Sequence, residues 1–277
     1  MKVFLTGSEG KVGRYFTSEF RRCGIDFIGF DKKNRQDLLD ARLIISAMAD
    51  CDTVMHLAVA TEASSPGNPN LLGENLKGLL NLLQAAESRS IKKIIFMSSV
   101  DALGIFKGEA PPLYFPIDDA HPCIPSTEYG IGKFLGERMC ALWSERTRIP
   151  SISLRPPGVW FTDTYTLIER MRKENPSYEW APYWEYGAFI DVEDLFEVSI
   201  KAAEKRMEVT TATYLVAAAD ITTSGRSSFE LAHRIHPKVE WKTLDDYQAN
   251  PFKSILDCRR AMTELDWRPR HSWAKRG

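Results

Sequence analysis

The chain has 277 residues, of which 44% are hydrophobic and 26% are charged, and its formal net charge is −1 at pH 7. This balance argues against a nucleic-acid-binding protein and against a protein of anionic membrane surfaces. The five cysteines are scattered without a Cys-x-x-Cys pair, which suits reduced thiols and predicts no metal site. Because a strand is predicted from Lys2 onward, with no signal peptide and no membrane-spanning apolar run, we expect a soluble, cytoplasmic protein.

A glycine-rich turn follows the first predicted strand, Lys2–Thr6. Three glycines are spaced as G-x-x-G-x-x-G before a helical pattern: Gly7, Gly10 and Gly13. Glycines so placed allow a tight turn, a close approach of the backbone to a pyrophosphate, and a helix that lies close to its strand. The N–H groups at the helix N-terminus also favour a phosphate. The alternative is an ordinary turn, and the flanking strand and helix favour dinucleotide binding.

A carboxylate ends the second predicted strand. The first helix stops at Gly24, and the strand Asp26–Phe30 leads to Asp31. A carboxylate in this position accepts hydrogen bonds from the adenosine ribose and repels a 2′-phosphate, which predicts NAD as the cofactor. Lys32 and Lys33 follow directly and are able to pair with that phosphate, so NADP remains the alternative.

Helices and strands then continue to alternate. The predicted elements are a helix at Asp40–Ala49, a strand at Thr53–Leu57, a helix at Leu72–Ser88, a strand at Lys92–Ser98, a helix from a cap at Ser126 to about Glu145, and a strand at Pro150–Arg155. This alternation predicts an α/β fold with a Rossmann-type, doubly wound parallel sheet. His56 lies in an apolar run, where a packed core residue is favoured over a ligand. Long loops are expected at Thr61–Asn70 and Gly104–Pro125.

Beyond Trp160 the alternation loosens. The predicted elements there are a helix at Tyr165–Lys173, a strand at Ala188–Val192, a helix at Glu193–Lys205, a strand at Thr213–Ala217, and helices at Phe229–Ile235 and Arg259–Leu265. We interpret residues 1–160 as a nucleotide-binding domain with returning elements around 188–217, interleaved with a small substrate-binding lobe at 161–277. The aromatic residues between Tyr178 and Phe189 either line a substrate pocket or form the core of this lobe.

Tyr129 and Lys133 are four residues apart on one predicted helix, so they lie on the same face. A nearby ammonium stabilises a phenolate, so we expect Tyr129 to have a pKa below that of an ordinary tyrosine and to exchange a proton near neutral pH. Lys133 is also able to reach the nicotinamide ribose. The spacing is common by chance, and its weight comes from its place just before the strand Pro150–Arg155.

These features, in this order, resemble the extended short-chain dehydrogenase/reductases of the NAD-dependent epimerase/dehydratase family. The resemblance spans nearly the whole chain and rests on Thr6-Gly7-x-x-Gly10-x-x-Gly13, Asp31, Asp37-Leu38, His56-Leu57-Ala58, Asn75-x-x-Gly78, Ser98-Ser99 through Gly104, Tyr129-x-x-x-Lys133, Arg155-Pro156-Pro157 and Asp191-Val192-x-Asp194. The closing run from Asp257 to Pro269 resembles the short tail of uronate dehydrogenases. Together the motifs are specific for the fold and the cofactor and poorly specific for the substrate.

The resemblance implies a catalytic set in which Ser99 holds the substrate oxygen, Tyr129 is the general acid/base and Lys133 is its electrostatic partner. It also implies these cofactor-binding residues: Gly7, Gly10, Lys11, Val12, Asp31, Asp37, Leu38, Leu57, Ala58, Val59, Asn75, Met97, Tyr129, Lys133, Pro156 and Pro157. The resemblance argues against dehydration as the reaction. At the position where the dehydratases of the family carry a motif like Thr-Asp-Glu, this chain has Ser99-Val100-Asp101, so the acid/base pair that eliminates water is incomplete. Arg155 is a candidate for binding a substrate carboxylate, with a structural role favoured.

The predicted function is therefore an NAD(P)-dependent oxidoreductase that transfers a hydride between the nicotinamide and a hydroxyl or keto carbon of a small sugar- or uronate-like substrate. An NAD-dependent sugar epimerase is the alternative. A non-catalytic cofactor-binding regulator is disfavoured, since Ser99, Tyr129 and Lys133 are all present. The helices Leu72–Ser88 and Tyr129–Trp143 are apolar nearly all round, and by resemblance they pair across a two-fold axis in a homodimer. A free, small polar substrate is favoured over a nucleotide-linked sugar.

Overall fold

The computed structural model of the chain describes residues 1–61, 66–106, 109–179, 185–208 and 210–275. Contacts within the chain divide it into two compact units. The first comprises Met1–Ser98, Thr127–Leu154 and Ala202–Thr213, and the second comprises Ser99–Ser126, Arg155–Lys201 and Tyr214–Gly277. Each unit is therefore assembled from three separate stretches of the chain.

The first unit is built around a six-stranded sheet. Across the sheet the strands run in the order β2 (Asp26–Phe30), β1 (Lys2–Thr6), β3 (Thr53–His56), β4 (Lys93–Met97), β6 (Ser151–Arg155) and β9 (Thr211–Leu215). The pairs β1–β2, β1–β3, β3–β4 and β4–β6 are parallel. The order changes direction beside β1, which confirms the doubly wound parallel sheet predicted from the alternation.

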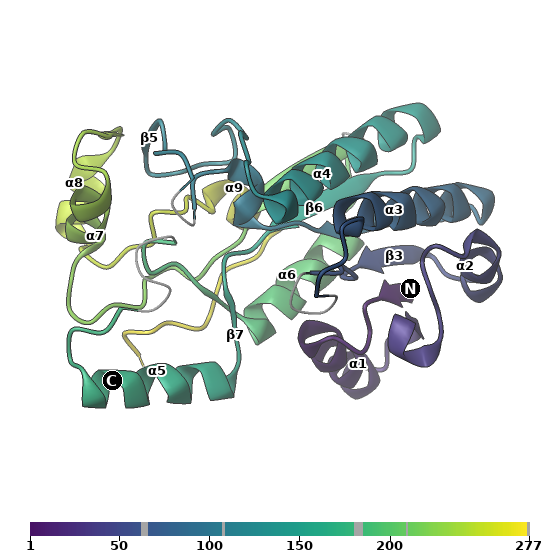
Figure 1. Ribbon diagram of the computed structural model, residues 1–277, viewed down its shortest axis with the longest axis horizontal. Helices are drawn as coiled ribbons and strands as arrows, with labels where there is room; N and C mark the ends of the chain where they lie inside the picture. The colour runs from purple at the N-terminus through teal and green to yellow at the C-terminus, as the bar shows by residue number, and fades with distance from the viewer. Residues whose placement is uncertain (62–65, 107–108, 180–184, 209, 276–277) are drawn as a thin grey trace. The chain divides into compact units, whose positions relative to one another are not determined.

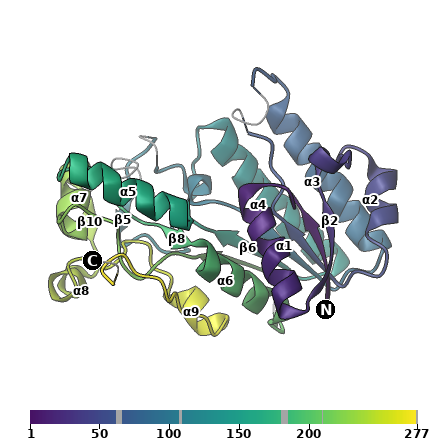
Figure 2. The same ribbon diagram turned by 90° about the horizontal axis from the view of Figure 1, so that it is seen from below.

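Helices cover both faces of this sheet. Helices α3 (Leu71–Ser88) and α4 (Glu128–Thr147) lie on one side, and α1 (Lys11–Cys23) lies on the other (Figure 1; Figure 2, seen from below, shows α1 in front of the strands). Phe4 and Val54 of the sheet belong to a core cluster with Leu79 and Leu83 of α3. Because alternate strand residues face opposite sides and both sides are covered, the strands read in sequence as continuous apolar runs.

The remaining elements range from two to 13 residues. They are η1 (Lys32–Asn34), α2 (Ala41–Ala47), η2 (Val100–Leu103), β5 (Tyr114–Phe115), β7 (Val159–Trp160), α5 (Thr162–Glu174), β8 (Ile190–Asp191), α6 (Val192–Glu204), α7 (Ser228–Ile235), β10 (Glu240–Trp241), α8 (Leu244–Ala249) and α9 (Arg259–Glu264). In the second unit β5 pairs with β10 and β7 pairs with β8, both in parallel. Buried aromatic side chains, among them Phe115 of β5 and Trp160 of β7, also hold this unit together.

Several predicted details change. Thr127, not Ser126, caps α4, because its hydroxyl accepts a hydrogen bond from the Gly130 N–H. In the aromatic stretch, Tyr186 and Phe189 are fully buried core residues, as the core interpretation requires. Trp180, Tyr183 and Trp184 lie outside the described residues. Across the described chain, none of the helices combines the length and apolar character needed to cross a membrane.

Candidate functional site

The glycine-rich turn between β1 and α1 is shaped by close backbone contacts. Gly7 has φ +73°, and a Cβ atom there would lie 2.7 Å from the backbone nitrogen of Ala58. A Cβ at Gly13 would lie 2.0 Å from the carbonyl oxygen of Gly7, so only glycine fits at either position. At Gly10 a Cβ would meet only that carbonyl, at 3.3 Å, which leaves its outer side open.

Helix α1 begins just after this turn, at Lys11. Its N-cap residue, Gly10, makes no side-chain capping hydrogen bond, and its first turn holds no acidic residue. Backbone N–H groups and the positive end of the helix dipole therefore meet at this end of the helix. This arrangement suits a phosphate or another anion.

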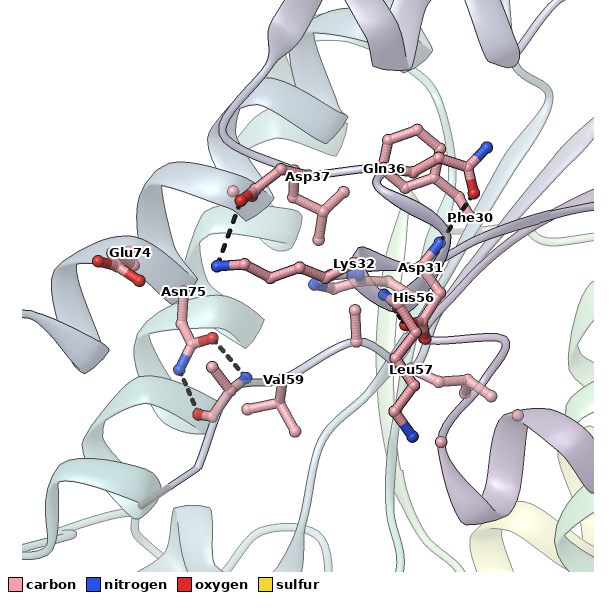
Figure 3. A pocket seen from close by; sticks show the side chains of 18 of the residues that line it. Phe30, Asp31, Lys32, Gln36, Asp37, His56, Leu57, Val59, Glu74 and Asn75 are labelled. Carbon is pink, nitrogen blue, oxygen red and sulfur yellow. Dashed lines mark hydrogen bonds and ion pairs between the residues drawn. The ribbon is translucent and has the colours of Figure 1, made fainter. Parts of the chain in front are cut away.

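A cavity of about 580 Å³ opens beside the turn, within the first unit (Figure 3). Its wall includes the predicted residues Gly7, Gly10, Lys11, Val12, Asp31, Asp37, Leu38, Leu57, Ala58, Val59 and Asn75. It also includes residues outside the predicted set of cofactor-binding residues: Gly13, Phe30, Lys32, Lys33, Gln36, Leu39, His56, Ala60, Glu74 and Gly78. Met97, Tyr129 and Lys133 also belong to the first unit but are not among the lining residues.

Asp31 joins the glycine-rich turn to the segment after β2. Its Oδ2 accepts the Glu9 N–H at 2.9 Å, and its Oδ1 accepts the Lys33 N–H at 2.9 Å, capping η1. The Lys33 ammonium donates to the Glu9 carbonyl at 3.1 Å. Each carboxylate oxygen has a second lone pair, so Asp31 still has capacity for a further donor in the cavity.

Two more polar contacts frame the cavity, and both are drawn in Figure 3. The Lys32 Nζ lies 3.2 Å from Asp37 Oδ2. The Asn75 side chain exchanges two hydrogen bonds with the main chain of Ala60, at 2.9 and 2.8 Å, which fixes the segment after β3 against α3.

His56 is buried at the end of β3 and lines the cavity. The Ala58 N–H donates to Thr6 Oγ1 at 3.3 Å, so the Thr6 hydroxyl is able to donate to His56 Nδ1, 2.7 Å away. Burial, and after it the charge of Lys133, lowers the His56 pKa to about 3. The ring is therefore neutral at physiological pH. The core interpretation from sequence is right about its packing but omits its place in the cavity wall.

The structure brings together Tyr129 and Lys133 on α4, as their spacing predicts. The Lys133 Nζ lies 5.6 Å from the centroid of the Tyr129 ring and donates a hydrogen bond to the Met97 carbonyl at 2.6 Å. One turn later Glu137, also buried, accepts a hydrogen bond from the Ser98 hydroxyl at 2.5 Å. These contacts join α4 to the carboxyl end of β4, where a parallel sheet places its ligand-binding residues.

The other predicted residues belong to the second unit. Ser99 is buried, and its hydroxyl accepts the Asp101 N–H at 3.1 Å at the start of η2. Pro156 and Pro157 are buried, and the Pro156 carbonyl accepts the Val100 N–H at 3.1 Å. Arg155 is also buried and donates to the Cys123 sulfur at 3.0 Å, in keeping with the structural role favoured from sequence.

Comparison with known proteins adds a family match. The model of the NAD dependent epimerase/dehydratase family matches residues 3–217. A putative UDP-glucose 4-epimerase of Methanocaldococcus jannaschii is 27% identical over 175 residues, covering 57% of this chain and 56% of that protein. A uronate dehydrogenase of Pseudomonas putida is 28% identical over 120 residues, covering 43% of this chain and 42% of that protein. The chain thus spans about half the length of these curated relatives.

A solved structure extends the likeness of fold over the whole chain. The UDP-glucose 4-epimerase of Thermotoga maritima superposes with a TM-score of 0.69 at 21% identity, covering 98% of this chain and 94% of that one. At this level of identity the likeness concerns the fold alone.

Proposed function

The chain belongs to the NAD dependent epimerase/dehydratase family, and we propose that it is an NAD-dependent oxidoreductase acting on a small sugar- or uronate-like substrate. The reaction transfers a hydride between the nicotinamide and a hydroxyl or keto carbon. The observation that carries this proposal is the cavity beside the glycine-rich turn, whose wall combines the N-terminal residues of α1 with Asp31 and Asp37.

These residues fit a dinucleotide. The N-terminus of α1, reached through Gly10, Lys11 and Val12, holds the pyrophosphate. Asp31 accepts the adenosine ribose hydroxyls, while Asp37 and Leu38 border the adenine. The segment Leu57–Val59 forms the wall along which the cofactor continues, and Asn75 keeps that segment in place through Ala60. NAD is the favoured cofactor and NADP the alternative.

The proposed catalytic residues handle the proton while the cofactor supplies the hydride chemistry. Tyr129 gives or takes the proton of the substrate oxygen, and Ser99 holds that oxygen by a hydrogen bond. Lys133 stabilises the phenolate and binds the nicotinamide ribose. By the family resemblance, Met97, Pro156 and Pro157 are also cofactor-binding residues. In this scheme the nucleotide-binding domain, residues 1–160 with returning elements around 188–217, holds the cofactor. The lobe at 161–277 holds the substrate.

An epimerase is the second candidate. The similarity to a putative UDP-glucose 4-epimerase favours it as much as the similarity to a uronate dehydrogenase favours net oxidation. Both reactions use the same residues, and an epimerase returns the hydride to the other face of the same carbon. A non-catalytic cofactor-binding regulator is the third reading, against which the complete set of Ser99, Tyr129 and Lys133 argues.

The proposal also includes a cytoplasmic location and a homodimer formed through α3 and α4. On α4 the side chains of Leu135 and Leu142 are 37% and 63% exposed. Large, solvent-exposed apolar side chains on a helix that also has a buried face are typical of a subunit interface.

The test is a panel of uronates, free sugars and nucleotide sugars with NAD and NADP, followed by the absorbance of the reduced cofactor. Chromatography of the products detects epimerisation, in which no reduced cofactor accumulates. Oxidation of a uronate or free sugar with NAD supports the leading proposal. Interconversion of two sugars without net reduction of NAD supports the epimerase. NAD binding without turnover of any compound supports the regulator, and absence of cofactor binding contradicts all three.

A further inference from the structure

Both lysines that follow Asp31 are held by neighbouring groups in the cavity wall. The Lys33 ammonium donates to the Glu9 carbonyl at 3.1 Å, which ties it to the glycine-rich turn. The Lys32 ammonium lies 3.2 Å from Asp37 Oδ2, across the cavity wall (Figure 3). Lysines next to Asp31 are the groups best placed to offset the charge of a 2′-phosphate on the adenosine ribose. Here both ammonium groups already have a partner.

Asp37 is itself fixed. Its Oδ1 accepts the Leu39 N–H at 3.0 Å, so Oδ2 is the oxygen that faces Lys32. This geometry holds the Asp37 charge beside the Lys32 ammonium. A 2′-phosphate would have to take Lys32 from this carboxylate and would also bring two negative charges near it and near Asp31.

We propose that Asp37 is a determinant of cofactor specificity, because it pairs with Lys32 and so withholds that ammonium from the 2′-phosphate of NADP. The inference rests on the proposed function and assigns Asp37 a second role besides bordering the adenine. It also implies that replacing Asp31 alone removes one repulsion but leaves Lys32 engaged.

The expected change in cofactor discrimination depends on how exposed the Lys32–Asp37 pair is to solvent. The side chains of Lys32 and Asp37 are 75% and 40% exposed, and exposed ion pairs are weak. Asp37→Asn keeps the Oδ1 acceptor for Leu39 and removes only the charge. We therefore expect it to lower the ratio of the dissociation constant of NADP to that of NAD about two- to fivefold, the range that breaking such a pair releases.

The experiment is isothermal titration calorimetry with NAD and NADP, which differ only by the 2′-phosphate on the adenosine ribose. The proteins are the wild type, Asp37→Asn, Lys32→Gln/Asp37→Asn and Glu74→Gln. Glu74 is the matched control, because it lines the same cavity and, among the described residues, has Asn68 and no lysine or arginine as its side-chain partner. Glu74→Gln therefore changes the cavity charge by the same amount without releasing a lysine.

The inference predicts that the ratio falls in Asp37→Asn, stays near the wild-type value in Glu74→Gln, and returns to that value in Lys32→Gln/Asp37→Asn. An equal fall in Asp37→Asn and Glu74→Gln would overturn it, since the cause would then be general charge. A fall that persists without Lys32, or no fall at all, would overturn it too. If the wild type binds NAD in any of these cases, the proposed function still stands. If the wild type does not bind NAD, both proposals fail together.

Discussion

The Lys133 ammonium donates a hydrogen bond to the Met97 carbonyl at 2.6 Å, joining α4 to the end of β4. The same ammonium lies 5.6 Å from the centroid of the Tyr129 ring. Because Lys133 is only 5% exposed, this contact leaves the lysine little freedom to move away. A cation held in this position stabilises a phenolate, which is what an acid/base tyrosine needs near neutral pH.

Tyr129→Phe therefore tests the proposed acid/base directly. We expect turnover to fall about 10²- to 10⁴-fold, the usual contribution of a general acid/base, while NADH affinity stays near the wild-type value. Rates with the best substrate of the panel and NADH fluorescence titrations measure the two effects. Tyr247→Phe is the matched control, since it removes a hydroxyl that donates to the Ser254 carbonyl. A Tyr129→Phe variant with most of its activity would exclude Tyr129 as the acid/base.

Buried His56 links stability to pH. Its folded-state pKa, about 3, is depressed below the ordinary value of 6.5, so on acidification the unfolded chain takes up a proton before the folded one. The stability that His56 contributes is thus complete above about pH 6.5 and is lost as the pH falls toward 3. His56→Asn keeps an acceptor for the Thr6 hydroxyl but cannot titrate.

Urea unfolding of the wild type and His56→Asn at several pH values between 7 and 4 measures this contribution. The difference in unfolding free energy between the two proteins should narrow on acidification by up to about 1.4 kcal/mol per pH unit. A difference that stays constant over this range would show that the histidine is already protonated in the folded protein or does not titrate in the unfolded one.

The features that can be predicted from the sequence are those that are determined by neighbouring residues in the chain. The strands of the sheet are predictable because burial on both faces makes each one a short apolar run, as in β4. Asp31 is predictable as a cavity residue because it follows a strand, and parallel strands end at one edge of the sheet. Asn75 lies on α3 and is predicted only by the family resemblance. By contrast, β5, β10 and α8 have two to six residues, too few for a periodic pattern.

Charged partners across the fold are also beyond sequence reasoning. Nothing in the pattern around Lys93 indicates that its ammonium donates to the carbonyls of Ala202, Ala203 and Lys205, more than 100 residues later. The same is true of the Lys32–Asp37 pair, which depends on the path of the short η1 segment. Such contacts follow from tertiary packing, which determines which carbonyl or carboxylate group lies within reach of each lysine side chain.

The Lys93 contact is itself testable. Its buried side chain caps the C-terminal end of α6 by satisfying carbonyls that have no partner within the helix. Lys93→Met fills a similar volume without a donor, so we expect it to lower the unfolding free energy by about 1–3 kcal/mol. Lys92→Met is the control, because the neighbouring Lys92 side chain is 77% exposed and pairs with Asp52. Losing this exposed ion pair should lower the unfolding free energy by at most about 1 kcal/mol. Equal urea midpoints for the two variants would contradict this role.

The proposed homodimer makes Leu142 the most informative surface residue of α4, because its side chain is 63% exposed. Placing a charge there by Leu142→Lys should convert a dimer to a monomer, since a buried unpaired ammonium is costly at an interface. Sedimentation velocity at micromolar concentration measures both proteins, with Leu113→Lys as the control at another exposed leucine. A wild-type monomer under these conditions would contradict the dimer, and a Leu142→Lys dimer would exclude this face.

The charges beside the described part of the aromatic stretch bear on the substrate. The Glu179 side chain is 7% exposed, and its carboxylate lies 3.4 Å from Arg172 Nη2 and 3.0 Å from Arg226 Nη1. The Ser224 N–H and hydroxyl donate to the same carboxylate. Arg172 and Arg226 are thus engaged with a buried acid, whereas a nucleotide diphosphate needs several cations or donors to offset its desolvated charge.

We therefore expect the protein to bind free sugars or uronates and not nucleotide-linked sugars. Calorimetry on the NAD-loaded protein compares UDP-, GDP- and dTDP-sugars with the free compounds. In the wild type only a free compound should bind, with a dissociation constant in the millimolar range or below. Glu179→Gln sharpens the test, because it frees both arginines and should make the protein bind a UDP-sugar better than the wild type does. Micromolar binding of a nucleotide sugar to the wild type, with none of the free compounds, would show that other donors hold the diphosphate and would favour the epimerase.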